Sequence, residues 1–92
     1  SDPLADIIRH HHERWDGSGY PDGLQKTDIH VLSRILAVAD AFDAMTSWRP
    51  YRDRMGLPAV IEELKKEAGA QFDPKVVGVL LRELEDGRVW PV

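Results

Sequence analysis

The stretch that decides the fold is IHVLSRILAVADAFDAMTS, residues 29–47. Its apolar side chains recur at intervals of three and four residues, which places them on one face of a helix. They are Ile35, Val38, Ala39, Phe42 and Met45. A helix with one apolar face packs against other elements, so we expect this helix to be central. Pro50 marks its end, because proline lacks a backbone N–H and disfavours helical geometry at the residue before it.

The segments on either side predict three further helices and no strand. The first is expected from residue 3 to about residue 14, the third over 58–68 and the fourth over 74–86. Proline opens each of them, and glycine follows the last two, as is usual at helix starts and ends. The predicted class is therefore all-α: a four-helix fragment in which a long glycine-rich loop, residues 16–28, separates the first two helices.

Composition narrows the class of protein. A chain of 92 residues holds one small domain or part of one. Hydrophobic residues make up 42% and charged residues 30%, a balance typical of a soluble globular protein. No apolar run approaches the roughly 20 residues that span a bilayer, so no membrane contact is expected. A net charge of -4 argues against a DNA or RNA polymer as partner. The absence of cysteine excludes thiolate metal sites and agrees with a cytoplasmic location.

Side chains that bind metals gather near the end of the first predicted helix. His11 and His12 stand there, and Asp40 follows in the central helix. Imidazole and carboxylate groups are ligands that a borderline divalent metal prefers. Because neighbouring residues on a helix point about 100° apart, the two imidazoles are expected to serve two adjacent ions. The alternative is that the triple histidine is a surface accident or a tag remnant, but a tag would not continue into ERWDGSGYP, residues 13–21.

Two carboxylates share one side of the central helix. The apolar neighbours of Asp40 predict a buried carboxylate, which is costly without a metal or an arginine beside it. Asp43 is three residues further on and is placed to orient a ligand. As an alternative, the two acids are partly exposed and form salt bridges with Arg34 or Arg49.

Two further pairs suggest a phosphorylated nucleotide ligand. Tyr20-Pro21, in the glycine-rich loop, offers an aromatic and a rigid ring that can stack on a nucleobase or a partner protein. Alternatively, this pair only pins the loop to the core. Arg49 and Arg52 follow the central helix, and their guanidinium groups suit the oxygens of a phosphodiester. Ordinary surface arginines are the alternative.

Three runs of sequence carry a resemblance to a known family. HHERWDGSGYPDGL, SRILAVADAFDAMTSWRPYR and GAQFDP resemble the C-terminal half of an HD-GYP domain, a bacterial branch of the HD phosphohydrolase superfamily. The resemblance implies that residues 1–92 are a partial domain whose N-terminal half, with the His-Asp pair, is absent. It also implies an all-α fold, two or three divalent metal ions, commonly iron or manganese, and hydrolysis of cyclic di-GMP to a linear dinucleotide or to GMP.

The same resemblance implies roles for individual residues. His11, His12 and Asp40 match metal ligands, and Arg49 and Arg52 match positions that contact the substrate phosphates. Residues 19–21, Gly-Tyr-Pro, match the signature that is associated with substrate recognition and with GGDEF-domain partners.

Other positions support or modify that pattern. Glu13 and Asp43 are expected to stand behind the ligands and support them. Lys26 stands where glycine is more usual, and His30 stands where proline often precedes the long helix. We expect these two changes to alter the shape of the loop without touching the ligands.

Three ligands are too few for a dinuclear hydrolase, so the isolated chain is expected to be inactive. Two other interpretations stay open. The chain is a non-catalytic module that presents residues 19–21 to a GGDEF-domain protein, or two copies associate as a homodimer and pool their ligands.

Overall fold

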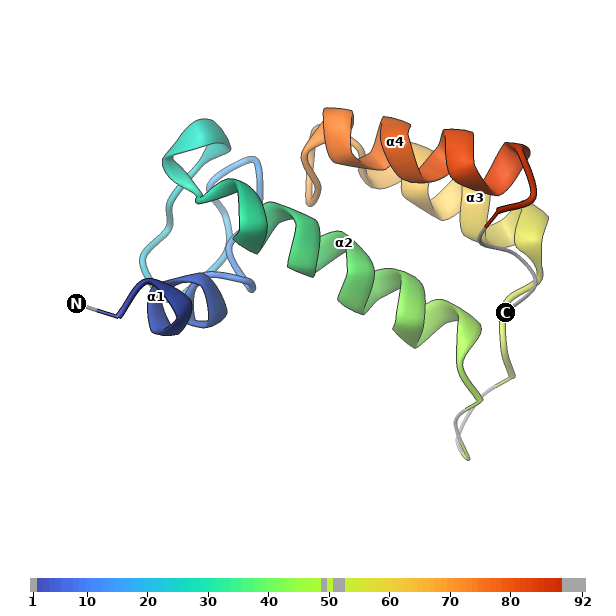
Figure 1. Cartoon of the computed structure of the whole chain (residues 1–92), viewed down its shortest axis with the longest axis horizontal. Coiled ribbons are helices and arrows are strands. Elements are labelled where there is room, and N and C mark those ends of the chain that lie inside the picture. The colour runs from blue at the N-terminus through green and yellow to red at the C-terminus, as the bar shows by residue number, and fades with distance from the viewer. Residues whose placement is uncertain (1, 49, 51–52, 89–92) are drawn as a thin grey trace.

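The computed structural model describes residues 2–48, 50 and 53–88, and in these it contains four α-helices and one 3-10 helix. They are α1 (Pro3–Arg9), η1 (Lys26–Asp28), α2 (Val31–Thr46), α3 (Leu57–Glu67) and α4 (Pro74–Glu85). Figure 1 shows α2 crossing the molecule, with α3 and α4 paired beside it and α1 near its N-terminal end. The predicted all-α class and the four helices are confirmed. Within the described ranges, no helix combines the length and apolar character that crossing a membrane requires.

Side-chain caps explain where three of the helices begin. Asp2 caps α1 and Asp73 caps α4, each carboxylate accepting the backbone N–H two residues further on, at 3.0 and 2.8 Å. His30 caps α2 in the same way, because its Nδ1 accepts the N–H of Leu32 at 3.0 Å. His30, which departs from the family pattern, is thus a working helix cap in this chain.

The α1 helix is shorter than the sequence predicts, ending at Arg9 rather than near residue 14. His11 and His12 therefore lie on a turn, not on a helix. The physical reason is tertiary. The backbone N–H groups of residues 15 and 16 donate to the carbonyls of residues 71 and 70, both at 3.0 Å. A continuous helix would use these donors internally, so the helix ends in favour of contacts with the α3–α4 connection.

A single core joins α2, α3 and α4. Its buried residues are Val38, Met45, Val60, Leu64, Phe72, Val77 and Leu84. Fully burying an apolar side chain of this kind stabilises the fold by about 1.5–3 kcal/mol. Ile35 and Ala39, which the periodicity places on the buried face of α2, are instead exposed. They line an apolar groove of about 450 Å³ between α2 and α4, which no described element covers.

Arg34 ties α2 to two other parts of the chain. Its Nη1 lies 2.6 Å from Oδ2 of Asp73, the capping residue of α4, which is 4% exposed. The same guanidinium lies over the ring of Trp15, 5.9 Å from the centroid. Because this ion pair is largely shielded from water, it holds the two elements together more firmly than a surface pair would.

Candidate functional site

A pocket of about 410 Å³ lies between α2 and the chain that follows α1. Its walls come from residues 11–20, from one face of α2 and from the α3–α4 connection. Five of the residues predicted from the sequence line it: His11, His12, Glu13, Tyr20 and Asp40. Pro21 and Asp43 do not line it. Arg49 and Arg52 lie outside the described residues.

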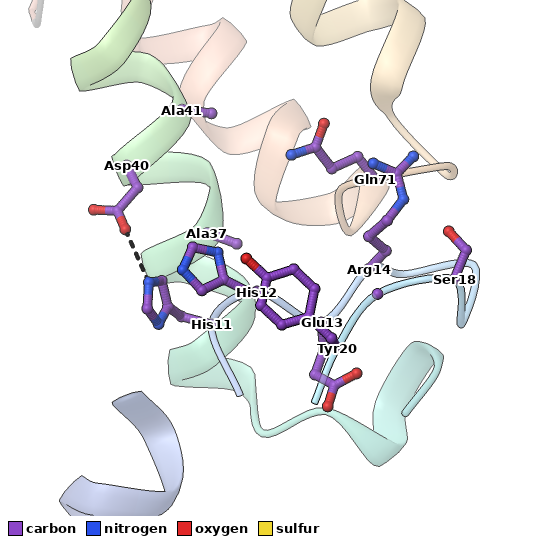
Figure 2. Close-up of a pocket in the computed structure, with 11 residues that line it drawn as sticks. His11, His12, Glu13, Arg14, Ser18, Tyr20, Ala37, Asp40, Ala41 and Gln71 are labelled. Atoms are coloured by element: carbon purple, nitrogen blue, oxygen red, sulfur yellow. Dashed lines mark ion pairs between the residues drawn. The ribbon is translucent and has the colours of Figure 1, made fainter. Parts of the chain in front are cut away.

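His11 and Asp40 face each other across this pocket (Figure 2). Nε2 of His11 lies 3.5 Å from Oδ2 of Asp40. The other ring nitrogen of His11, Nδ1, donates to the carbonyl of Ile8 at 2.5 Å. That bond fixes the tautomer and leaves the lone pair of Nε2 directed at the pocket, which is how metal-binding histidines are usually oriented. Ligand atoms about 2.1 Å from one ion and at a tetrahedral angle are about 3.4 Å apart, so this pair fits a metal.

His12 is held between two other rings. Its ring centroid lies 3.9 Å from that of His11, and it stacks on Tyr20 at 5.1 Å with an interplanar angle of 19°. The turn thus brings the imidazoles side by side, whereas the helical geometry expected from the sequence would splay them. Both rings line one pocket, in which a mixed imidazole and carboxylate donor set suits a divalent transition metal.

The carboxylate of Asp40 is 58% exposed, so the prediction of a costly buried charge is wrong. The cause is that Asp40 lies on the face of α2 that borders the pocket rather than the core. Arg34, offered as an alternative partner for the two acids, pairs with Asp73 instead. Asp43 is exposed and accepts a hydrogen bond from the Ser47 hydroxyl at 2.9 Å, and its supporting role stays a prediction.

Glu13 anchors the loop that carries the Gly-Tyr-Pro run. The residue is 4% exposed, and its two carboxylate oxygens accept the backbone N–H groups of Asp22 and Leu24, at 2.8 and 3.0 Å. Figure 2 shows this carboxylate directed away from His11 and His12. Glu13 therefore fixes the shape of the loop, and its expected support of the ligands stays a prediction.

The Gly-Tyr-Pro run lies against the turn that carries the histidines. The Tyr20-Pro21 peptide bond is cis. A Cβ at Gly19 would come within 2.5 Å of the backbone of both His12 and Arg14, so only glycine fits this crossing. Tyr20 is 62% exposed and stacks on His12, so it does not pin the loop to the core.

Another group of potential ligands lies beside the loop. One ligand atom from each of His10, Glu13 and Asp22 lies within 4.8 Å of the others. Nε2 of His10 is 2.7 Å from Asp22, and the Arg9 guanidinium is 3.2 Å from the same carboxylate. The hydrogen bonds from His10 and then Arg9 lower the pKa of Asp22. Since Arg9 already balances the charge and both oxygens of Glu13 are engaged, this group serves the loop's structure.

Three polar residues that the sequence did not single out line the pocket: Arg14, Ser18 and Gln71. Arg14 follows the histidines directly, and Gln71 belongs to the GAQFDP run. Both therefore lie within runs that resemble the family. Their meeting depends on the contact between residues 15–16 and 70–71, which no spacing along the chain reveals.

Comparison with known proteins identifies the family of the chain. The HD domain family model matches residues 1–76. The chain is 46% identical over 78 residues to a cyclic di-GMP phosphodiesterase of Thermotoga maritima, covering 85% of this chain and 21% of that protein. It is 50% identical over 76 residues to the cyclic di-GMP phosphodiesterase response regulator RpfG of Xanthomonas campestris pv. campestris, covering 83% of this chain and 20% of the regulator.

A second substrate occurs among the similar proteins. The 3'3'-cGAMP-specific phosphodiesterase 2 of Vibrio cholerae is 44% identical over 81 residues, which cover 88% of this chain and 16% of that protein. The crystal structure of a cyclic GMP-AMP-specific phosphodiesterase from V. cholerae superposes with a TM-score of 0.81 at 28% identity, covering 96% of this chain and 20% of that one. The chain thus spans about a fifth of the length of these relatives.

Proposed function

The chain belongs to the HD domain family, in its HD-GYP branch, and on that premise we propose that it is part of a metal-dependent phosphodiesterase that hydrolyses cyclic di-GMP in bacterial signalling. The observation that carries the proposal is the pair His11 and Asp40, 3.5 Å apart, with Nδ1 of His11 tied to a backbone carbonyl. An imidazole held in this way has its other nitrogen free for a metal.

The proposed roles follow from the chemistry of each side chain. His11, His12 and Asp40 hold their share of two or three divalent ions, iron or manganese. Such ions supply an activated water and polarise phosphoryl oxygens. Arg49 and Arg52 anchor the phosphodiester, and Tyr20-Pro21 contacts the substrate beside the histidines. A cytoplasmic location belongs to the same proposal.

Residues 1–92 are, in this proposal, the C-terminal portion of an HD-GYP domain. Three ligand side chains do not complete a dinuclear site, so the isolated chain is expected to lack turnover. Incubating it with cyclic di-GMP and either iron or manganese tests this directly. Clear hydrolysis would contradict the need for further ligands, while leaving the substrate assignment in place.

Metal binding by the chain itself is the sharper test. Calorimetry with Mn²⁺ should show affinity at least tenfold weaker in Asp40→Asn and His11→Ala than in the unchanged chain, because each loses a ligand atom. Asp53→Asn, an exposed aspartate away from the pocket, is the matched control and should stay within twofold. Equal affinity in all four proteins would remove the physical basis of the phosphodiesterase proposal.

A second function is favoured by the exposure of Tyr20. This side chain is 62% exposed beside the pocket, which leaves it accessible to a GGDEF-domain protein. In this alternative the chain presents residues 19–21 to that partner and catalyses nothing. A pull-down with Tyr20→Ala should then lose the partner, and unchanged capture would exclude this surface.

A further inference from the structure

The pocket has two chemically different sides. Figure 2 shows His11, His12 and Asp40 on one side, Arg14 and Gln71 on the other, and the ring of Tyr20 between them. A volume of about 410 Å³ falls within the range of about 300–1,000 Å³ typical of small-ligand sites. A nucleotide whose phosphate lies at the histidine side therefore directs its base toward the side of Arg14 and Gln71.

The backbone that carries Arg14 and Gln71 is held in place by contacts within the chain itself. Two backbone hydrogen bonds, both 3.0 Å, join residues 15–16 to residues 70–71 and so place Arg14 beside Gln71. The neighbour of Gln71, Phe72, is 3% exposed and belongs to the core. The backbone under both side chains is thus tied to the rigid part of the molecule.

The charges around Arg14 favour a neutral group over a phosphate. Its guanidinium lies 3.6 Å from Asp16 and 3.6 Å from Glu67, so two carboxylates surround one positive charge. A further anion at this place would meet a net negative environment. The edge of a nucleobase carries no net charge and still offers oxygen and nitrogen acceptors to a guanidinium.

Gln71 adds a second hydrogen-bonding group. Its carboxamide makes no hydrogen bond to any residue that the structure describes, although it lines the pocket. An amide offers both a donor and an acceptor. In recognition of bases, arginine pairs with O6 and N7 of guanine, and glutamine is suited to N6 and N7 of adenine.

We propose that Arg14 and Gln71 form the base-binding end of this pocket and that Arg14 makes it prefer a guanine base over an adenine base. The inference rests on the proposed function, since it presumes a cyclic dinucleotide in the pocket. Arg14 donates to O6 and N7 of guanine. At an adenine the N6 amino group, itself a donor, replaces O6 and faces the guanidinium donor to donor, so Arg14 contributes little to the binding of an adenine base. Gln71 bonds the same purine edge through its carboxamide.

The test is an NMR titration of the 92-residue chain with cyclic di-GMP and, separately, with cyclic di-AMP. Cyclic di-GMP should bind about tenfold more tightly, the size expected for one bidentate base contact. Signals of the Gln71 side-chain NH2 and the Arg14 Nε–H should shift on binding. Arg14→Met, which keeps the aliphatic stem, should lower the affinity for cyclic di-GMP about tenfold and leave that for cyclic di-AMP within twofold.

Arg88→Met is the matched control. Arg88 is a surface arginine between two carboxylates, those of Glu83 and Asp86, and does not line the pocket. It should change neither affinity. Retained binding of cyclic di-AMP by Arg14→Met also verifies that this variant is folded.

Three outcomes would overturn the inference. If the unchanged chain binds both dinucleotides equally and Arg14→Met alters neither, the base preference is wrong while the proposed function survives. If Arg14→Met loses both ligands equally, Arg14 is a general anchor or a structural residue. If the unchanged chain binds neither ligand, the inference fails, because Arg14 and Gln71 are both present in it, whereas the proposed function is judged separately by the Mn²⁺ titration.

Discussion

The buried carboxylate of Glu13 holds the loop that borders the pocket. Replacing Glu13 with glutamine keeps the size of the side chain but turns one acceptor oxygen into an NH2 group. In the unchanged chain the two carboxylate oxygens of Glu13 accept the backbone N–H groups of Asp22 and Leu24. In the variant, the new NH2 group therefore faces one of these N–H groups, and two donors meet without an acceptor. A buried donor without an acceptor costs about 1–3 kcal/mol, so Glu13→Gln should lower the free energy of unfolding by that amount in urea denaturation.

Glu85→Gln provides the comparison for this prediction. Glu85 is exposed at the last turn of α4. The same chemical change at an exposed position should alter the free energy of unfolding by no more than about 0.5 kcal/mol. Equal losses in the two variants would mean that the hydrogen bonds of Glu13 contribute nothing specific.

Asp16 titrates differently because of Ser18. The Ser18 hydroxyl and then its backbone N–H donate to this carboxylate at 2.6 and 2.9 Å, and they lower the pKa of Asp16 below its ordinary value of 3.8. A lowered pKa in the folded state adds stability above pH 3.8 that is lost as the pH falls through the folded value.

Ser18→Ala removes the largest of these causes. In ¹³C NMR titration the pKa of Asp16 should rise toward 3.8. The stability that this carboxylate contributes above pH 3.8 should shrink, and the acid limb of the stability curve should become shallower, because the folded and unfolded states then bind the proton at closer pH values. The pKa of Asp22, which His10 and Arg9 lower, is the internal reference and should not move. A constant Asp16 pKa would show that the serine bonds do not hold in solution.

Single residues show how far sequence reasoning reaches. The types and spacing of His11, His12 and Asp40 were enough to predict that they share one site, and the structure brings them to one pocket. The exposure of Asp40 was not predictable, because it depends on which side of α2 the rest of the chain covers. Gln71 was missed for a similar reason, since only the folded backbone brings it to Arg14.

At the scale of elements, the segment between α1 and α2 depends on one close crossing at Gly19. A methyl group there would lie 2.5 Å from the backbone nitrogen of Arg14 and from the carbonyl oxygen of His12. Backbone cannot give way as a flexible side chain can, so Gly19→Ala should displace the loop. We expect a loss of about 1–3 kcal/mol in thermal unfolding and weaker Mn²⁺ binding.

Gly78→Ala is the control for this change. Gly78 lies inside α4, and a methyl group there meets only the end of the Arg82 side chain, at 3.8 Å. Because alanine favours helix over glycine by about 1 kcal/mol, this variant should be unchanged or more stable. If Gly19→Ala were as stable as Gly78→Ala, the close backbone contact at Gly19 would be contradicted.

Some helix ends are determined by nearby residues in the sequence, and others are determined by contacts with distant parts of the chain. The start of α4 at Asp73-Pro74 and the turn at Gly69, with φ of 84°, follow from the sequence alone. The end of α1 does not, because it is decided by hydrogen bonds to residues 70–71, far along the chain. The 3-10 helix at Lys26–Asp28 escaped prediction as well, since three residues carry no periodicity.

For the whole molecule, the homodimer interpretation remains a prediction. The groove between α2 and α4 exposes apolar side chains, among them Ile35 at 45% and Val79 at 52%. If two copies pair through it, sedimentation velocity at rising concentration should show a shift from monomer to dimer. Val79→Lys should abolish that shift, and Lys66→Glu, exposed on α3, should not. A strict monomer at high concentration would exclude the pairing.

Arg34 couples the segment beside the pocket to the start of α4, because its guanidinium contacts both. One guanidinium braces both Trp15, next to the pocket wall, and the first turn of the final helix. Fraying of that turn therefore removes the ion pair that helps to hold the Arg34 guanidinium over Trp15. Through this one side chain, loosening the start of α4 also weakens the support of the segment that follows the pocket residue Arg14.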